Sequence, residues 1–382
     1  MSGSSIPTRV LHIGESILGG CGTYLNEVVP LQMKALGPDN VRCLVPYQHA
    51  GQLRDVPSEA VWTFERSSRP AGLPRLAVGA MRAVRQWRPD LVHAHSTFAG
   101  ATVRGLGLML PMPPVVYCPH GWVFDVATPG WARSATRTAE RWLSHRCAAI
   151  VAISDAERVQ GLAAGIVQSK LKLVRNGVAA TLPPQRAAWQ DGRIKLLFVG
   201  RLDRQKGADV LLEATRNLGD KFCVRIVGKA VVGADGKAAH AVPPHVQMLG
   251  WLDLPDVAAQ INAADVIVMP SRWEGFGLVA VEAMRAGKPV VASAVGGLVE
   301  IVVDGVTGCL VPAGDAASFE RVLRGLDRAR LFAMGEAGRD RFQRLFTSER
   351  TVVELLNLYE DVLSRLPVPT PHRPADSAGQ AP

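Results

Sequence analysis

The sequence predicts an α/β protein with two doubly wound parallel-sheet domains that face a central cleft. The chain has 382 residues, which is more than one ordinary core holds and suits two domains. Apolar strand-like segments alternate with amphipathic helix-like segments, a pattern typical of a parallel sheet covered on both faces. Residues 178–192 interrupt this alternation with paired prolines, and the same pattern then begins again.

The first half predicts one such sheet. A strand over 9–14 ends before a glycine cluster, and a helix over 23–36 follows until Gly37 and Pro38 stop it. Further strands are expected at 41–46, 91–95, 115–121, 148–154 and 170–177, with helices at 73–87 and 99–110. We therefore expect an N-terminal Rossmann-like domain over 1–182.

The second half repeats the pattern after a linker that we place at 183–192. Strands are expected at 193–200, 221–228, 246–250, 265–271 and 289–295, with helices at 208–218, 256–263, 278–286 and 316–326. They predict a second Rossmann-like domain over 193–345. An amphipathic segment predicts a C-terminal helix within 346–366 that packs back toward the first domain, and residues 367–382 read as a disordered Pro-rich tail.

The composition excludes several classes of protein. The six cysteines form no CxxC pair, so neither a disulfide framework nor a zinc site is indicated. No apolar stretch approaches the roughly 20 residues that span a bilayer. The first 16 residues lack the pattern of an export signal, and we expect a cytoplasmic protein.

The positive charge is concentrated in the first half. Residues 1–190 hold 20 Lys and Arg against 11 Asp and Glu, whereas residues 191–382 hold 23 of each. Two Arg-rich segments, 69–88 and 132–146, carry interleaved apolar residues. Each is either a solvated helix with an inward apolar stripe or a site that docks on an anionic bilayer at the inner face of the cell membrane. No nucleic-acid reading motif accompanies them, so we expect no nucleic-acid partner.

The strongest chemical signal is a pair of cations after a strand of the second half. The segment LLFVGRLDRQKG ends its strand at Gly200 and then supplies Arg201 and Lys206. Two cations beyond one strand end can clamp phosphate oxygens. The alternative is that both side chains belong to a solvated face.

A second signal lies in the segment EGFGLVAVE. Glu274 is expected in a loop, Gly275 and Gly277 flank Phe276, and Glu282 falls in the helix that starts near Gly277. The glycines let the backbone approach a ligand, and the N–H groups of Gly277 and Leu278 at a helix N-terminus favour an anion. Without such a ligand, Glu274 and Glu282 are ordinary carboxylates at a helix start and on a helix face.

These segments together resemble the retaining glycosyltransferases of family 4, which have the GT-B fold. The E-x7-E motif, the VGRL and QKG segments, NGV at 176–178 and the GGCG loop carry the resemblance, which runs from about residue 9 to 345. It implies that Arg201 and Lys206 bind the donor diphosphate without a metal and stabilise the leaving nucleotide. Glu274 is then expected on the transferred sugar, Glu282 on the ribose, and the backbone of Phe276 to Leu278 on the phosphates.

In the first half, the resemblance implies an acceptor-side domain. Gly19, Gly20 and Gly22 match the glycine-rich loop near the donor phosphates, and His120 in CPHGW matches the HG motif on the reactive face of the sugar. Without the resemblance, the glycines are a tight turn and His120 a structural histidine. His93 and His95 at a strand end are expected on the pocket wall or on the acceptor rather than on a metal, because no carboxylate or cysteine joins them at ligand spacing.

The resemblance thus implies a metal-independent hexosyltransferase that needs no cofactor. We expect it to move a hexose from a UDP- or GDP-sugar to a saccharide or lipid-linked acceptor in exopolysaccharide, capsule or lipopolysaccharide assembly. One alternative is a non-catalytic GT-B module that only binds a nucleotide. The other is an NAD-dependent oxidoreductase, which is disfavoured because GGCGTYL lacks the third glycine of GxGxxG and no acidic residue follows the second strand.

Overall fold

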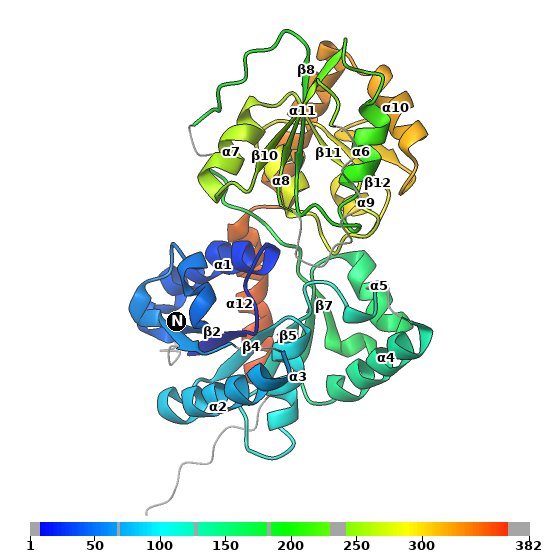
Figure 1. The fold of residues 1–382 in the computed structure, drawn as a ribbon. Helices are drawn as coiled ribbons and strands as arrows, with labels where there is room; N and C mark the ends of the chain where they lie inside the picture. The colour runs from blue at the N-terminus through cyan, green and yellow to red at the C-terminus, as the bar shows by residue number, and fades with distance from the viewer. Residues whose placement is uncertain (1–7, 67–68, 126–128, 182–184, 230–241, 366–382) are drawn as a thin grey trace, which may run out of the picture.

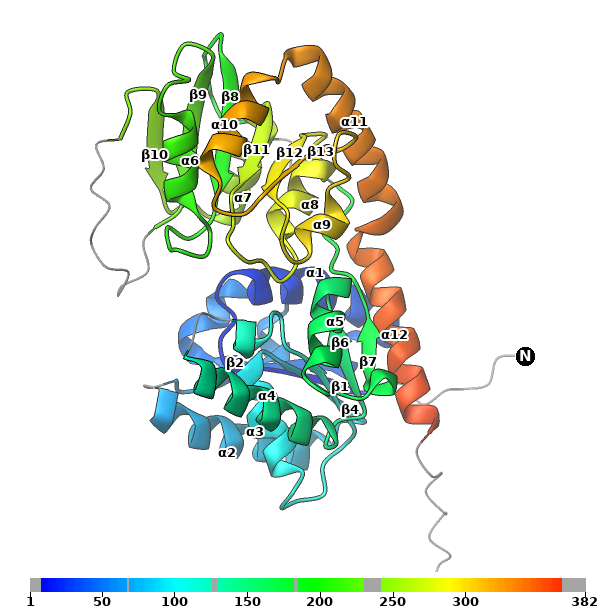
Figure 2. The same cartoon turned by 90° about the vertical axis from the view of Figure 1, so that its right-hand side faces the viewer.

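The structure is a computed structural model that describes residues 8–66, 69–125, 129–181, 185–229 and 242–365. The tail predicted at 367–382 lies outside these residues. Two parallel sheets are stacked one above the other as separate lobes (Figures 1 and 2). This confirms the predicted fold class.

The sheet of the N-terminal lobe has the order β3-β2-β1-β4-β5-β6-β7. Its strands in the described part of the chain are β1 (Val10–Gly14), β2 (Val41–Pro46), β3 (Val61–Phe64), β4 (Leu91–His95), β5 (Val115–Cys118), β6 (Ala149–Ala152) and β7 (Leu171–Leu173). Strand order reverses between β1 and β4, and ligands of such sheets bind beyond the carboxyl ends of the strands at this point.

Helices cover both faces of this sheet. They are α1 (Gly20–Leu36), α2 (Arg69–Trp87), α3 (Thr97–Leu106), α4 (Gly130–Ser144) and α5 (Asp155–Ala163). Alternate residues of the strands point to opposite faces. Leu11 and Val92 accordingly pack in the same cluster as residues of α2 and α3, whereas Val10 and Leu91 pack in the cluster that contains α1 and the last helix.

The sheet of the C-terminal lobe has the order β10-β9-β8-β11-β12-β13, with the same kind of reversal between β8 and β11. Its strands are β8 (Ile194–Val199), β9 (Phe222–Val227), β10 (Val246–Gly250), β11 (Val266–Met269), β12 (Val290–Ser293) and β13 (Gly308–Val311). The helices are α6 (Ala208–Thr215), α7 (Leu254–Ala263), α8 (Leu278–Arg285), α9 (Leu298–Ile301), α10 (Ala316–Arg324), α11 (Arg328–Leu345) and α12 (Ser348–Ser364).

The last helix returns to the first lobe. Figure 2 shows α11 beside the upper lobe and α12 continuing down along the lower one. The chain crosses at Val178, whose N–H donates to Phe346 O and whose carbonyl accepts from Ser348 N–H, both at 3.0 Å. Gly177 allows this crossing, because a Cβ there would lie 2.2 Å from Thr347 O. In α12, Tyr359 then reaches α1, where Gln32 Nε2 donates to its hydroxyl at 3.2 Å.

The carboxyl ends of the two sheets face each other. Ser154, after β6, donates its hydroxyl to Gly275 O at 3.0 Å. A Cβ on Gly275 would lie 3.5 Å from Gly121 Cα, so the loop after β11 approaches the loop after β5 closely. The two strand-order reversals therefore open toward one interlobe region. Within the described parts of the chain, no helix combines the length and the low polarity needed to cross a bilayer.

Candidate active site

The cation pair lies in the loop between β8 and α6. Lys206 Nζ contacts Glu274 Oε2 at 2.5 Å, and the two side chains are 22% and 10% exposed. Arg201 is 51% exposed, and its guanidinium donates to Asp203 Oδ2 at 2.8 Å and to Gln205 Oε1 at 2.7 Å. Each cation is thus held in place by a neighbouring oxygen, and Lys206 is the more enclosed of the two.

Close backbone approach shapes this loop. The N–H of Gly200 donates to Val227 O at 3.0 Å, and a Cβ on Gly228 would lie 1.8 Å from Gly200 O. Gly207, with φ 69°, begins α6 and would place a Cβ 2.1 Å from Pro270 O. Gly228 and Gly207 allow the loop after β8 to lie against β9 and the end of β11, which brings Lys206 to Glu274.

The E-x7-E segment joins β11 to α8. Gly277 caps α8 with φ 109°, and a Cβ there would lie 2.7 Å from Leu298 Cδ2. The Phe276 side chain is buried and packs edge-on against Phe346, with ring centroids 6.1 Å apart, so only its backbone can serve a ligand. The first turn of α8, which includes Leu278, holds no acidic residue, which leaves the positive helix end open to an anion.

Glu282 lies one turn further along α8 and faces the first lobe. Burial raises the pKa of its carboxyl to about 7; the charge of Glu27 on α1 raises it further, and Arg285 opposes the rise. The carboxyl is therefore close to half protonated near neutral pH. In that state it can both donate to and accept from a hydroxyl group.

The glycine loop of the first lobe forms the start of α1 rather than a separate turn. Gly19 caps the helix with φ 73°, and Gly20 and Gly22 belong to its first turn. A Cβ on Gly22 would lie 2.2 Å from Ile17 O, and one on Gly20 would lie 3.8 Å from Leu278 Cδ1. The N-termini of α1 and α8 therefore meet across the interlobe region, and the first turn of α1 also lacks an acidic residue.

His120 follows β5 in a left-handed conformation, with φ 54°. Gly121 continues the turn with φ 102° and donates its N–H to Glu157 Oε1 at 2.6 Å. The other oxygen of Glu157 accepts from Ile153 N–H at 2.7 Å. One buried carboxylate thus holds the ends of β5 and β6, which fixes the backbone of His120 beside Gly275.

The side chain of His120 belongs to a buried cluster that sequence analysis missed in part. His12 and His93 are register partners on β1 and β4, as are Gly14 and His95, so three histidines share one face of the sheet. His12, His93 and His95 are at most 1% exposed and lie beneath α1 and α12. The expectation that His93 and His95 line the pocket or contact the acceptor is therefore wrong, because alternate residues of β4 on this face point into the core.

The fold also brings Cys118 to His95 and His120, within reach of a common ion, although sequence spacing indicated no such cysteine. Burial raises the pKa of the Cys118 thiol well above its usual range, which disfavours the thiolate that a metal binds. Hydrogen bonds also join His12 to His95 at 2.9 Å and His95 to His120 at 3.0 Å. These bonds occupy lone pairs that a metal would need.

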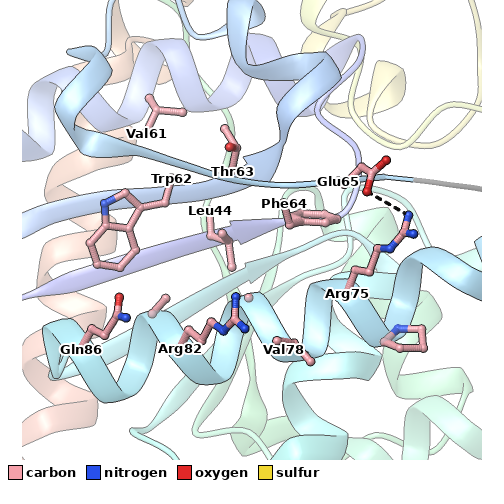
Figure 3. A pocket seen from close by; sticks show the side chains of 13 residues that line it. Leu44, Val61, Trp62, Thr63, Phe64, Glu65, Arg75, Val78, Arg82 and Gln86 are labelled. Atoms are coloured by element: carbon pink, nitrogen blue, oxygen red, sulfur yellow. Dashed lines mark ion pairs between the residues drawn. The ribbon is translucent and has the colours of Figure 1, made fainter.

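A separate cavity of about 800 Å³ lies in the first lobe between β3 and α2 (Figure 3). Leu44, Phe64 and Val78 give it apolar walls, and Arg75 pairs with Glu65 at 3.3 Å at its side. None of the residues predicted for the site lines this cavity. The residues predicted to carry phosphate and sugar chemistry instead lie in the loops between the lobes.

Comparison with known proteins finds relatives for both lobes. A family model described as Glycosyltransferase Family 4 matches residues 34–182, and one described as Glycosyl transferases group 1 matches residues 193–327. An uncharacterized 41.2 kDa protein in the cps region of Klebsiella pneumoniae is 32% identical, covering 81% of this chain and 87% of that protein. D-inositol 3-phosphate glycosyltransferase 1 of Catenulispora acidiphila is also 32% identical, covering 81% of each.

Solved structures share the two-lobe fold. Sucrose-phosphate synthase from Thermosynechococcus elongatus matches with a TM-score of 0.77 and 22% identity, over 94% of this chain and 99% of that one. Anabaena HepE in complex with UDP-glucose matches with a TM-score of 0.75 and 21% identity, over 94% of this chain and all of that one. At this identity the likeness concerns the fold alone.

Proposed function

Because this chain belongs to glycosyltransferase family 4 and is a glycosyltransferase with the GT-B fold, we propose that it transfers a hexose from a UDP- or GDP-sugar with retention of anomeric configuration. The family removes the oxidoreductase alternative, and the relatives make the chain an enzyme rather than a binding module. A nucleotide-sugar donor is supported by HepE, whose solved complexes contain UDP and UDP-glucose.

The observation that carries the proposal is the Lys206–Glu274 contact beside the N-terminus of α8. A departing nucleoside diphosphate develops negative charge on its phosphate oxygens. That charge would be stabilised by fixed donors, namely Lys206, Arg201 and the N–H groups at the starts of α8 and α1. A metal ion would then not be needed to neutralise the diphosphate. Glu274 would exchange its contact with Lys206 for hydroxyl groups of the transferred sugar, and Glu282 would bind the ribose.

We further propose that the acceptor is a saccharide or lipid-linked saccharide of exopolysaccharide, capsule or lipopolysaccharide assembly. The relative in the Klebsiella pneumoniae cps region supports a polysaccharide product. With retention, the acceptor hydroxyl would enter on the face that the diphosphate leaves, and the approach of the His120 backbone to Gly275 supports assigning that face to the His120 side. The two carboxylates of a retaining glycosidase are not needed when the leaving group itself is a stabilised diphosphate.

Peripheral contact with an anionic membrane at the cytoplasmic side is part of the proposal. On α4, Trp131 and Trp142 are 78% and 55% exposed, and Arg133, Arg137 and Arg141 of the same helix are exposed as well. Exposed tryptophan and arginine on one helix suit the boundary between lipid headgroups and acyl chains. Figure 2 shows α4 and α2 on the lower lobe, away from the upper one, so docking there would leave the interlobe region accessible.

A donor screen tests the proposal. UDP- and GDP-sugars are incubated with the protein and saccharide acceptors, release of UDP or GDP is followed, and the anomeric configuration of the product is read by NMR. Donor binding is measured separately from the rise in melting temperature, which needs no acceptor. Arg201→Ala and Glu274→Ala should abolish turnover. Arg204→Ala removes an exposed arginine of the same loop as a matched control and should retain it.

Two results would each contradict one part of the proposal. If no nucleotide sugar binds or is consumed, the donor assignment is wrong. If the product has the opposite anomeric configuration, the donor assignment stands and retention is wrong.

A further inference from the structure

A continuous row of hydrogen bonds runs through the core of the first lobe from α12 to His120. Tyr359 OH contacts Gln32 Nε2 at 3.2 Å, and Gln32 Oε1 contacts His12 Nε2 at 2.7 Å. His12 Nδ1 then contacts His95 Nε2 at 2.9 Å, and His95 Nδ1 contacts His120 Nε2 at 3.0 Å. Every imidazole between the two ends uses both of its ring nitrogens.

The rings in this row are neutral. Burial lowers the pKa of His12 and of His120 to about 4, and it lowers the pKa of His95 well below its usual range, with the neighbouring rings adding to the effect on His95. A neutral imidazole has one N–H donor and one bare acceptor nitrogen. In a row of such rings, the donor and acceptor of one ring therefore decide those of the next.

Gln32 sets the direction of the row. Its amide nitrogen donates to Tyr359 OH, and that hydroxyl can then donate its own hydrogen to His93 Nδ1, 2.6 Å away. The amide oxygen of Gln32 is left to face His12, so His12 Nε2 must be the donor and its Nδ1 must be bare. His95 Nε2 donates to that bare atom, and His120 Nε2 in turn donates to His95 Nδ1.

We propose that Gln32, His12 and His95 are positioning residues that hold His120 as the neutral tautomer with hydrogen on Nε2. The Nδ1 lone pair is then the only acceptor of the His120 ring, and it is not used by the row. His120 accepts a hydrogen bond from a substrate hydroxyl and donates none to the leaving diphosphate. This last step rests on the proposed function, whereas the tautomer follows from the row itself.

The backbone supports the same role. His120 is held at φ 54° by the turn into Gly121, whose N–H is bound by Glu157. Its ring also lies edge-on to Tyr24 of α1, with centroids 4.8 Å apart. With backbone and ring plane fixed, the remaining freedom of the side chain is which nitrogen carries the hydrogen, and the row removes that freedom.

The direct test is nitrogen NMR of the protein labelled with ¹⁵N-histidine, without any substrate. Long-range proton–nitrogen spectra distinguish a protonated ring nitrogen from a bare one, and the His120 signals are assigned by their loss in His120→Asn. We expect bare Nδ1 and protonated Nε2 at neutral pH for His12, His95 and His120. A protonated Nδ1 on His120, or a doubly protonated ring, in the wild-type protein overturns the proposal.

The second test breaks the row. In His12→Phe the ring is replaced by one of similar shape that accepts no hydrogen bond, so His95 loses its partner and His120 should populate both tautomers. We expect kcat to fall about tenfold, with the donor KM unchanged, since one neutral hydrogen bond orders the ring. Tyr24→Phe is the matched control, because Tyr24 packs edge-on to the His120 ring, with centroids 4.8 Å apart, and its buried hydroxyl has no hydrogen-bond partner in the described part of the chain, so the row from Gln32 to His120 stays intact.

Gln32→Met provides an independent break if His12→Phe does not fold, because it removes the amide that sets the direction. An unchanged His120 tautomer in either broken variant overturns the proposal, as does an equal loss of kcat in Tyr24→Phe. The outcome is separable from that of the donor screen. If the tautomers are as proposed but the protein consumes no nucleotide sugar, only the proposed function is contradicted. If the enzyme is active but His120 populates both tautomers, only this inference is contradicted.

Discussion

The two lobes contribute to the site by opposite physical means. The C-terminal lobe presents formal charges that are partly exposed, as in Lys206, Glu274 and Arg201. The N-terminal lobe presents a neutral, buried network that ends at the partly exposed His120. The charged side chains can exchange their partners within the protein for the oxygens of a diphosphate. The neutral hydrogen-bonded row, in contrast, can only keep or lose its order. Substitutions in the two lobes should therefore fail in different ways.

The largest effect is expected at Lys206. In Lys206→Met the ammonium that faces the diphosphate is lost, and Glu274 is left partly buried without its counter-charge. We expect kcat to fall by a factor of about 100 to 1,000, as for removal of one preorganised donor from a site of developing charge. Steady-state kinetics with the donor found in the screen measure this. Lys221→Met makes the same change far from the site, where Lys221 contacts Arg324 O, and should leave kcat unchanged.

A second effect is expected at the start of α8. Gly277→Ala puts a side chain at φ 109° and a Cβ 2.7 Å from Leu298 Cδ2, so the turn that aims α8 at the diphosphate must shift. We expect the free energy of unfolding to fall by about 1 to 3 kcal/mol and the donor KM to rise. Gly305→Ala is the control, because its φ is 73° but its Cβ would meet nothing within 4 Å. A loss at Gly305 as large as that at Gly277 would mean that φ alone, and not the contact with Leu298, is responsible.

Buried strands were predicted from the sequence more accurately than edge strands, polar helices and helix starts. Strand bounds at 41–46 and 91–95 agree with the structure, because buried parallel strands are continuous apolar runs. The edge strand β3 was missed because only Phe64 of its four residues is buried, so it does not form a continuous apolar run. The polar helix α11 was missed because it lacks a clear apolar stripe. The helix start at Gly20 was placed three residues late, because glycine is a poor helix former.

The candidate site shows the same limit. Arg201 and Lys206 lie in the loop after β8 and Glu274 lies in the loop after β11, and a local motif singles out each loop, although the roles of the three residues remain predictions. His12, Gln32 and Tyr359 were missed because their meeting depends on strand register and on the return of α12, more than 300 residues after α1 begins. One local signal was present. In RVLHIG and LVHAH, the histidines stand at positions that share a face when the two strands pair.

The carboxyl of Glu282 offers a smaller effect that joins the lobes. Its pKa in the folded protein is about 7, above the ordinary value of 4.5, so the folded state binds the proton more tightly than the unfolded state. Its contribution to stability is complete below about pH 4.5 and is lost as the pH rises toward 7. Relative to wild type, Glu282→Gln should therefore gain stability over this range, by about 1 to 3 kcal/mol at pH 7 and above.

Urea unfolding of the two proteins at several pH values measures the difference. Wild type and Glu282→Gln must be compared because the histidine cluster changes the stability with pH in the opposite direction. The pKa values of His12 and His120 are lowered, so their contribution to stability rises as the pH increases from about 4 to 6.5. Glu282→Gln leaves those rings in place, and a difference that does not change with pH would show that the pKa of Glu282 is not raised in the folded protein.

The smallest effect is expected at the outer surface of the first lobe, where exposed cations attract an anionic membrane without forming a binding pocket. Arg133→Gln on α4 removes one of its exposed cations and should weaken binding to vesicles that contain anionic phospholipid by about fivefold, from about 1 kcal/mol per arginine near such a surface. Vesicle co-sedimentation at low and high salt measures it, with neutral vesicles as the reference. Arg344→Gln makes the same charge change on α11 of the other lobe. If both variants lose binding equally, net charge and not α4 drives the association, and the proposed orientation on the membrane is wrong.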